Sequence, residues 1–334
     1  MGDAFCTFRR PRCQMAAENP RTPTRRNLKL ILAFVSRRLF AVNSGFPRMF
    51  GRLAAIFLVV AAAGCSTINI AYNAGPTALA FIADGYLDLD SEQAAILKER
   101  ILAVREWDRT SNLADYAKLL AEVRNRAAVR ITADDVAWAV AEARKRSLPM
   151  AERVATEVAE LAPLLNADNL AAMKKKMERK TADYIKDVTR ATPEKQLERR
   201  FENVKAESER WYGGFDHEQL ERIRAMVEAL PANYPLALTN RARRQAEFVA
   251  ILTAAVNKTA DKSETRRRML RLLTDWEAIR TPAYQAYAAQ YQAASYKLTA
   301  EIANMATPAQ RETAQKRARR WVEDMTALAN RPAH

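Results

Sequence analysis

The feature that most constrains the fold is a repeated helix-start pattern, in which an oxygen-bearing side chain is followed three residues later by Gln or Asp. The pattern begins at Asp90, Thr132, Asp216 and Thr307, with its second member at Gln93, Asp135, Gln219 and Gln310. In such a capping box each side chain accepts a hydrogen bond from the backbone N–H of the other residue, which satisfies donors that a helix leaves free at its start. Thr192-Pro193 and Thr281-Pro282 indicate two more starts, because Pro suits the first helical position.

Apolar residues between these starts recur three and four positions apart, as in Leu220, Ile223, Val227 and Leu230. This spacing places them on one face of a helix. No alternating run of strand length occurs, and only four glycines follow Cys65, too few for the turns of a sheet protein. We predict an all-α fold of about ten amphipathic helices, in a helical-bundle-like domain over residues 90–330.

Breaks between helices are expected where Pro, Gly, Asn and Ser gather. They fall near residues 75–76, 109–110, 130–131, 147–149, 163–166, 191–193, 213–215, 231–235, 257–263, 280–282 and 306–308.

An apolar run over residues 53–63 ends in Gly64 and Cys65. A secretory signal has an apolar stretch of ~7–15 residues closed by small side chains, whereas a membrane-spanning helix needs ~20. We therefore interpret residues 49–64 as a lipoprotein signal peptide, and the thiol of Cys65 as the site of lipid attachment. An ordinary secretory signal that ends beside a cysteine is the alternative.

The segments on either side follow from this interpretation. Residues 1–48 are Arg-rich and interrupted by prolines, and Met49 opens a short basic head suited to export, so residues 1–48 are interpreted as an over-extended, disordered start. The stretch 36–40, which resembles a twin-arginine export signature, is the alternative. Residues 65–89 are expected to form a lipidated tether and docking segment, in which Gly75-Pro76 breaks any helix.

Much of the distinctive composition lies before Cys65. Eleven of the 54 basic residues and two of the 39 acidic residues precede it, so the net charge falls from +15 to +6 once the leader is removed. The high isoelectric point therefore gives no reason to expect nucleic-acid binding. Cys6 and Cys13 are removed as well, so the processed chain has no cysteine pair for a disulfide.

The segment after Cys65 carries a family resemblance. Tyr72-Asn73 follows the lipobox, and an aromatic-x-x-Asp-x-Tyr-x-x-Leu-x-x-x-Gln arrangement runs from Phe81 to Gln93. These features resemble an uncharacterised family of proteobacterial outer-membrane lipoproteins, although family members usually have Trp where Phe81-Ile82 stand. The resemblance implies an envelope location and an all-helical body, but no activity. Ser66, in place of the Asp that favours retention in the inner membrane, favours the periplasmic face of the outer membrane.

Candidate site residues are few. Tyr72, Asn73 and Asp84 are candidate partner contacts, because neither capping nor helical periodicity requires their side chains. His217, beside an expected helix start, is interpreted as a solvated side chain rather than a catalytic base. No Gly-rich phosphate loop occurs. We therefore expect no catalytic residues, no metal, and no cofactor other than the covalent lipid on Cys65.

Three further features allow two interpretations each. Basic clusters either form solvated helix faces or meet an anionic lipid or glycan. Tyr284, Tyr287 and Tyr291 share a helix face, which is either core or a glycan contact. The recurring Asp- or Thr-x-x-Gln pattern is similar to the Leu-Thr-x-x-Gln motif of small periplasmic stress chaperones, but capping alone explains it. The basic clusters lie at 174–180, 241–244, 266–271 and 316–320.

These observations predict a lipid-anchored, periplasm-facing outer-membrane lipoprotein that acts by binding, as a scaffold or accessory protein of the cell envelope. Its partners would be the membrane, through the acyl chains, and an envelope protein. A periplasmic holdase is the first alternative, and a hydrolase of unrecognised mechanism is the second.

Overall fold

The computed structural model describes residues 67–275 and 278–332. The predictions for residues 1–48, for the signal peptide and for Cys65 concern positions outside these ranges and stay predictions. Within these ranges, no helix combines the length and the apolar character needed to cross a bilayer.

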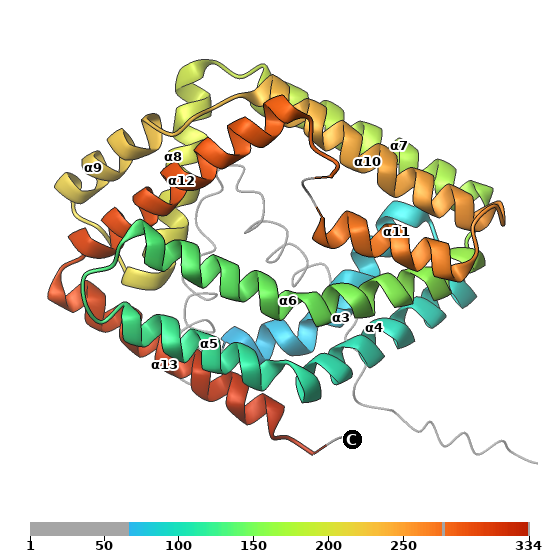
Figure 1. The fold of residues 1–334 in the computed structure, drawn as a ribbon, viewed down its shortest axis with the longest axis horizontal. Helices are drawn as coiled ribbons and strands as arrows, with labels where there is room; N and C mark the ends of the chain where they lie inside the picture. The colour runs from blue at the N-terminus through green and yellow to red at the C-terminus, as the bar shows by residue number, and fades with distance from the viewer. Residues whose placement is uncertain (1–66, 276–277, 333–334) are drawn as a thin grey trace, which may run out of the picture. The chain divides into compact units, whose positions relative to one another are not determined.

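The described residues form eleven α-helices and no strand, which confirms the predicted all-α class (Figure 1). A 3₁₀ helix, η1 (Ala162–Leu164), and a π-helix, η2 (Ile185–Thr189), extend two of them. The α-helices are α3 (Thr67–Leu87), α4 (Ser91–Ser111), α5 (Leu113–Arg126), α6 (Ala133–Leu161), α7 (Ala167–Tyr184), α8 (Pro193–Tyr212), α9 (His217–Glu228), α10 (Tyr234–Val256), α11 (Lys262–Thr274), α12 (Pro282–Met305) and α13 (Pro308–Ala329).

All six predicted helix starts are confirmed. Asp90, Thr132, Asp216 and Thr307 form complete capping boxes. The N-cap threonines of α8 and α12 accept a hydrogen bond from the third helical residue, with Pro at the first helical position. Such a cap is worth ~1 kcal/mol, so caps locate helix starts without deciding the fold.

Helices far apart in the sequence pack along one another. Helix α13 lies along α5, α11 along α6, and α12 contacts α6, α9 and α10 (Figure 1). Four clusters of buried apolar side chains hold these contacts together. One of them joins Phe201 on α8 to Ile223 on α9 and Ile302 on α12. The predicted stripes therefore do face the core, as Ile223 and Val227 are fully buried.

Four capping boxes meet in two pairs, an arrangement that we call the crossed caps. In the first pair, Gln219 Nε2 on α9 donates to Met305 O (3.2 Å), and Gln310 Nε2 on α13 donates to Gly214 O (2.7 Å). Each accepting carbonyl lies two residues before the N-cap of the other helix. The two amides also bond each other, at 2.9 and 3.0 Å.

The second pair joins α4 to α7 in the same way, because each side-chain amide donates to the carbonyl two residues before the N-cap of the other helix. Gln93 Nε2 donates to Leu164 O (2.8 Å) and to Asn169 Oδ1 (3.0 Å), while Asn169 Nδ2 donates to Asp88 O (3.2 Å). Asn169 is the third helical residue of a capping box that the sequence analysis missed. The recurring Gln therefore caps its own helix and also fixes the start of a second helix.

Two predicted breaks are wrong, and both involve Pro. Helix α3 runs through Gly75 and Pro76, and α6 runs through Pro149, where a break was expected at residues 147–149. An interior Pro costs ~3 kcal/mol, because it removes one hydrogen bond and crowds the preceding turn. Packing outweighs this cost: Pro76 is buried where α3 contacts α4, α7 and α13. Pro149 is exposed, so water can reach the freed carbonyl, and α6 is held by α5 before it and by α11 after it.

Candidate functional site

A cavity of about 560 Å³ lies between α5, α6, α8, α12 and α13. Its walls are mainly apolar, and each of the five helices contributes. The lining includes Leu120 and Val123 from α5, Trp138 and Ala139 from α6, Val204 and Trp211 from α8, Leu298 and Ile302 from α12, and Ala314 and Ala318 from α13. Several lining residues are alanines, whose short side chains leave space that larger side chains would occupy.

The polar groups around this cavity mostly bond to one another. The Arg126 guanidinium stacks 3.6 Å from the centre of the Trp138 ring and forms an ion pair with Asp135 at 3.8 Å. Gln315 Nε2 donates to Arg124 O at 2.9 Å. Two of the lining residues are exposed to solvent, Val129 by 70% and Tyr291 by 40%, so the cavity opens beside them, and we call the opening beside Tyr291 the mouth. The cavity therefore offers a ligand an open mouth and apolar walls, which suits binding of an apolar group.

Asp135 is the carboxylate in this lining with the clearest electrostatic setting. Its pKa is lowered by hydrogen bonds from the backbone and side chain of Thr132, the N-cap of α6, and further by Arg126. A carboxylate held in its ionised form by a cap is poorly suited to act as a general acid at neutral pH. The described residues also contain no group of three metal-ligating side chains.

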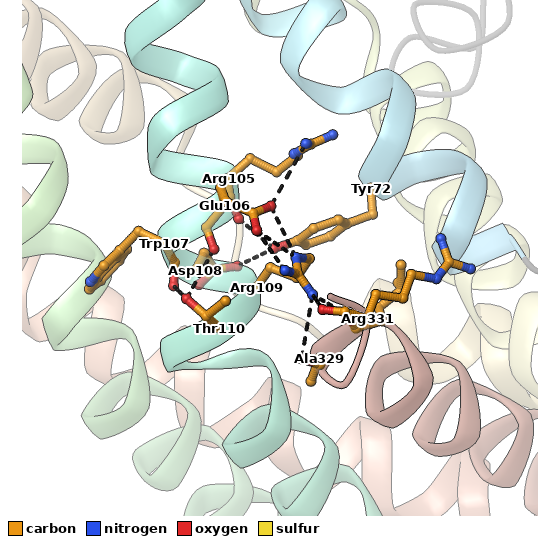
Figure 2. A network of polar contacts seen from close by, with 10 residues as sticks. Tyr72, Arg105, Glu106, Trp107, Asp108, Arg109, Thr110, Ala329 and Arg331 are labelled. Atoms are coloured by element: carbon orange, nitrogen blue, oxygen red, sulfur yellow. Dashed lines mark hydrogen bonds and ion pairs between the residues drawn. The ribbon is translucent and has the colours of Figure 1, made fainter. Parts of the chain in front are cut away.

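The three candidate partner-contact residues all lie on α3, but in different surroundings. The Tyr72 hydroxyl donates to Arg105 O (2.9 Å) and to Asp108 Oδ2 (3.2 Å) on α4 (Figure 2). Asp84 Oδ1 accepts a hydrogen bond from Leu89 N (3.2 Å) just after the helix. Asn73 is exposed. Tyr72 and Asp84 therefore have intramolecular contacts, and Asn73 offers its side chain to solvent.

Figure 2 shows a second polar contact beside Tyr72, between α4 and the end of α13. Arg109, only 6% exposed, donates from Nη1 to Leu328 O (2.8 Å) and Arg331 O (2.6 Å) and pairs with Glu106. A helix leaves its last carbonyls without partners, and a cation there also complements the helix dipole. We call this contact the Arg109 clasp.

Asp108 is 8% exposed, and its carboxylate lies close to the hydroxyls of Tyr72 and Tyr116. It also accepts a hydrogen bond from Asn112 Nδ2 at 3.0 Å. Burial, together with this negative charge and a hydrogen bond to it, raises the pKa of Tyr116 to about 12. The same causes raise the pKa of Tyr72 further. Both phenols therefore stay protonated well above neutral pH and can donate to Asp108.

The remaining sequence features are distributed over the surface. Several basic clusters are paired, as in Arg268–Glu247 (3.0 Å) and Lys316–Glu312 (2.7 Å). The tyrosine stripe is not part of the apolar core: Tyr284 and Tyr287 are half-buried, and Tyr291 lies at the cavity mouth. No local pattern predicted the cavity, because five helices each supply a few side chains to it.

The fold and the cavity define an all-helical protein, in the part that the structure describes, with an apolar ligand cavity as its candidate site. The family model described as Family of unknown function (DUF6279) matches residues 85–285, and the chain belongs to this family. No curated protein and no solved structure matches the chain. The predicted resemblance to a family without an assigned activity is thereby confirmed, from the end of α3 to the start of α12.

Proposed function

We propose that this protein is a lipid-anchored lipoprotein on the periplasmic face of the outer membrane, and that its helical body binds a single acyl chain. The observation that carries the proposal is the apolar cavity of about 560 Å³, whose mouth lies beside Tyr291. Pockets that bind small apolar ligands measure ~300–1,000 Å³ and are lined mainly by hydrophobic and aromatic side chains. Trp138, Trp211 and Leu298 supply such a lining.

The anchor is supported by the apolar run that ends at Cys65 and by the surface of α3, which begins two residues later. Ile70, Leu79, Phe81 and Ile82 are each at least 45% exposed on this helix. Exposed apolar side chains in one helix are typical of a surface that meets lipid or another protein. A helix of this character beside an acylated residue would lie against the bilayer and hold the cavity near its ligand.

The acyl-chain proposal is tested with the soluble fragment 66–334 and dodecanoate. Binding at one site should change the fluorescence of Trp138 and Trp211, which line the cavity. Ala303→Phe fills the cavity from α12 and should abolish the change, while Ala293→Phe, at an exposed position on the same helix, should leave it intact. Equal binding by wild type and Ala303→Phe would place the ligand elsewhere.

The anchor is tested separately by intact-mass analysis of protein extracted from the envelope. The mature chain should begin at Cys65 and carry added lipid, and Cys65→Ala should accumulate as an unprocessed precursor. Recovery of Cys65→Ala as a mature periplasmic protein of normal mass would refute the lipid anchor.

A scaffold role through Tyr72, Asn73 and Asp84 stays a prediction. Substituting all three would also remove the contacts of Tyr72 with α4 and of Asp84 with Leu89. Asn73→Ala is the cleaner variant, because this side chain is exposed. Loss of an envelope crosslink in Asn73→Ala, with unchanged stability, would support a partner contact at this position; unchanged crosslinks would argue against one there.

A further inference from the structure

The basic cluster at residues 241–244 and the tyrosine stripe, about 40 residues later, come together where α10 contacts both α7 and α12. The Arg241 guanidinium on α10 lies 5.4 Å from the centre of the Tyr184 ring on α7. The Arg280 guanidinium, just before α12, lies 5.6 Å from the Tyr284 ring. We call Tyr184, Arg241, Arg280 and Tyr284 the Arg–Tyr cluster. All four side chains are half-buried.

The positive charges in this cluster have no carboxylate partner among the described residues. Among the described residues, no Asp or Glu forms an ion pair with Arg241 or Arg280, whereas other arginine-rich stretches are paired, as in Arg268–Glu247. Nε of Arg241 is buried and has no hydrogen-bond partner there. Burial lowers the pKa of the neighbouring Arg244, and the positive charges of Arg280 and Arg241 lower it further. Positive charge is therefore concentrated here, and one N–H donor of Arg241 has no partner among the described residues.

The backbone beside Tyr184 is also unusual. Helix α7 passes at Ile185 into the π-helix η2, which contacts α10. Single π-helical turns are rare and occur frequently at functional sites. In this chain the irregular turn directly follows Tyr184, whose ring lies beneath the Arg241 guanidinium.

The tyrosine stripe connects the cluster to the cavity. The ring centres of Tyr284 and Tyr287 are 5.8 Å apart, and those of Tyr287 and Tyr291 are 6.2 Å apart. Tyr291 lies at the cavity mouth. Seven residues of helix span ~10 Å, so the cluster lies about that distance along α12 from the mouth.

We propose that the Arg–Tyr cluster binds a phosphate group, and that this phosphate is the headgroup of the amphiphile whose acyl chain enters the cavity. Guanidinium groups bind phosphate through paired, charge-assisted hydrogen bonds, and a cation–π contact with a tyrosine ring uses none of their N–H donors. The acyl-chain part rests on the proposed function, whereas the phosphate part stands on the cluster alone.

The test uses the purified full chain, held in solution by an amphipathic polymer, and three probes. Decyl phosphate carries both groups, 1-decanol only the chain, and inorganic phosphate only the head. The double variant Arg241→Gln/Arg280→Gln should weaken decyl phosphate binding at least about tenfold, because two charge-assisted contacts are lost. Its affinity for 1-decanol should not change. Phosphorus NMR reports the bound phosphate, and tryptophan fluorescence reports the chain.

Two further variants keep the result interpretable. Arg267→Gln removes the same charge from an exposed position on α11 and should leave every affinity unchanged. Arg280→Lys keeps the charge but not the paired donors and should bind decyl phosphate between wild type and Arg280→Gln. Circular dichroism and the unfolding midpoint show whether each variant is folded.

The outcomes separate the two parts of the proposal. Equal decyl phosphate affinity in the double variant and wild type, or an equal loss in Arg267→Gln, would overturn the phosphate site. Arginine-dependent binding of inorganic phosphate without any binding of 1-decanol would keep the phosphate site and refute the acyl-chain cavity. If inorganic phosphate binds with arginine dependence but the decyl chain adds no affinity, the physiological ligand is a free phosphate compound rather than a lipid.

Discussion

The crossed cap between α9 and α13 makes a quantitative prediction about two residues 91 positions apart. Gln219, 7% exposed, accepts from Asp216 N at 3.1 Å, donates to Met305 O at 3.2 Å, and exchanges two hydrogen bonds with Gln310. Gln219→Ala removes all four and leaves their partners unsatisfied. At ~0.5–1 kcal/mol net for each hydrogen bond, the lower part of the usual range, the free energy of unfolding should fall by about 2–4 kcal/mol.

The reciprocal contact should appear as an energetic coupling. Gln310→Ala loses the same two inter-amide bonds as Gln219→Ala, so the double variant loses them only once. The double variant should therefore be more stable than the sum of the two single effects predicts, by ~1–2 kcal/mol for two hydrogen bonds. A control cycle of Gln219→Ala with Gln93→Ala, which lies in the other crossed cap, should be additive within ~0.5 kcal/mol.

Urea unfolding followed by circular dichroism measures these free energies. Domains of this size tolerate such losses, because typical stabilities are ~5–15 kcal/mol. A coupling below ~0.5 kcal/mol between Gln219 and Gln310, with both variants folded, would show that the amides only cap their own helices. The recurring pattern would then have no role beyond ordinary helix capping.

Two further predictions concern the contacts beside α3. The pKa values of Tyr72 and Tyr116 are raised in the folded protein, so their protonated hydroxyls stabilise the fold. This contribution to the free energy of unfolding is fully present below about pH 10, the ordinary tyrosine pKa, and is lost as pH rises toward 12. Tyr116→Phe should flatten this alkaline loss in unfolding titrations, whereas Tyr291→Phe, at an exposed position, should not. Arg109→Met removes the clasp on the end of α13 and should lower the thermal midpoint by several degrees. The exposed Arg320→Met should change the midpoint little, and equal shifts in the two variants would contradict the clasp.

Helix starts were predictable because a cap is a local interaction within four residues. Asp90, Thr132, Asp216 and Thr307 each select the start of their helix from their own side chain and the third helical residue. The continuous helices through Pro76 and Pro149 were not predictable in this way. Their local cost is outweighed by packing against helices distant in the sequence, and a local rule contains no information about those neighbours.

The candidate site, unlike the helix starts, could not be predicted from local sequence. The cavity depends on where five helices leave space, and Ala303 and Ala314 read in the sequence as ordinary helix formers. The Arg–Tyr cluster was predictable in part. Its tyrosine stripe and its arginines were both visible as separate patterns, but only the packing of α10 against α12 brings Arg241 and Arg280 to the same region.

The crossed cap and the Arg109 clasp together bear on how the cavity works. Helix α13 supplies one cavity wall through Ala314 and Ala318. Its start is fixed by Gln219 and its end by Arg109. A wall held at both ends cannot move outward without breaking these hydrogen bonds, so a ligand should enter a largely preformed cavity through the mouth at Tyr291 rather than open the helices. Variants at Gln219 or Arg109 should then bind the ligand with lower affinity, because α13 becomes more mobile, although neither residue lines the cavity. A ligand that opened the helices would instead bind such variants with higher affinity.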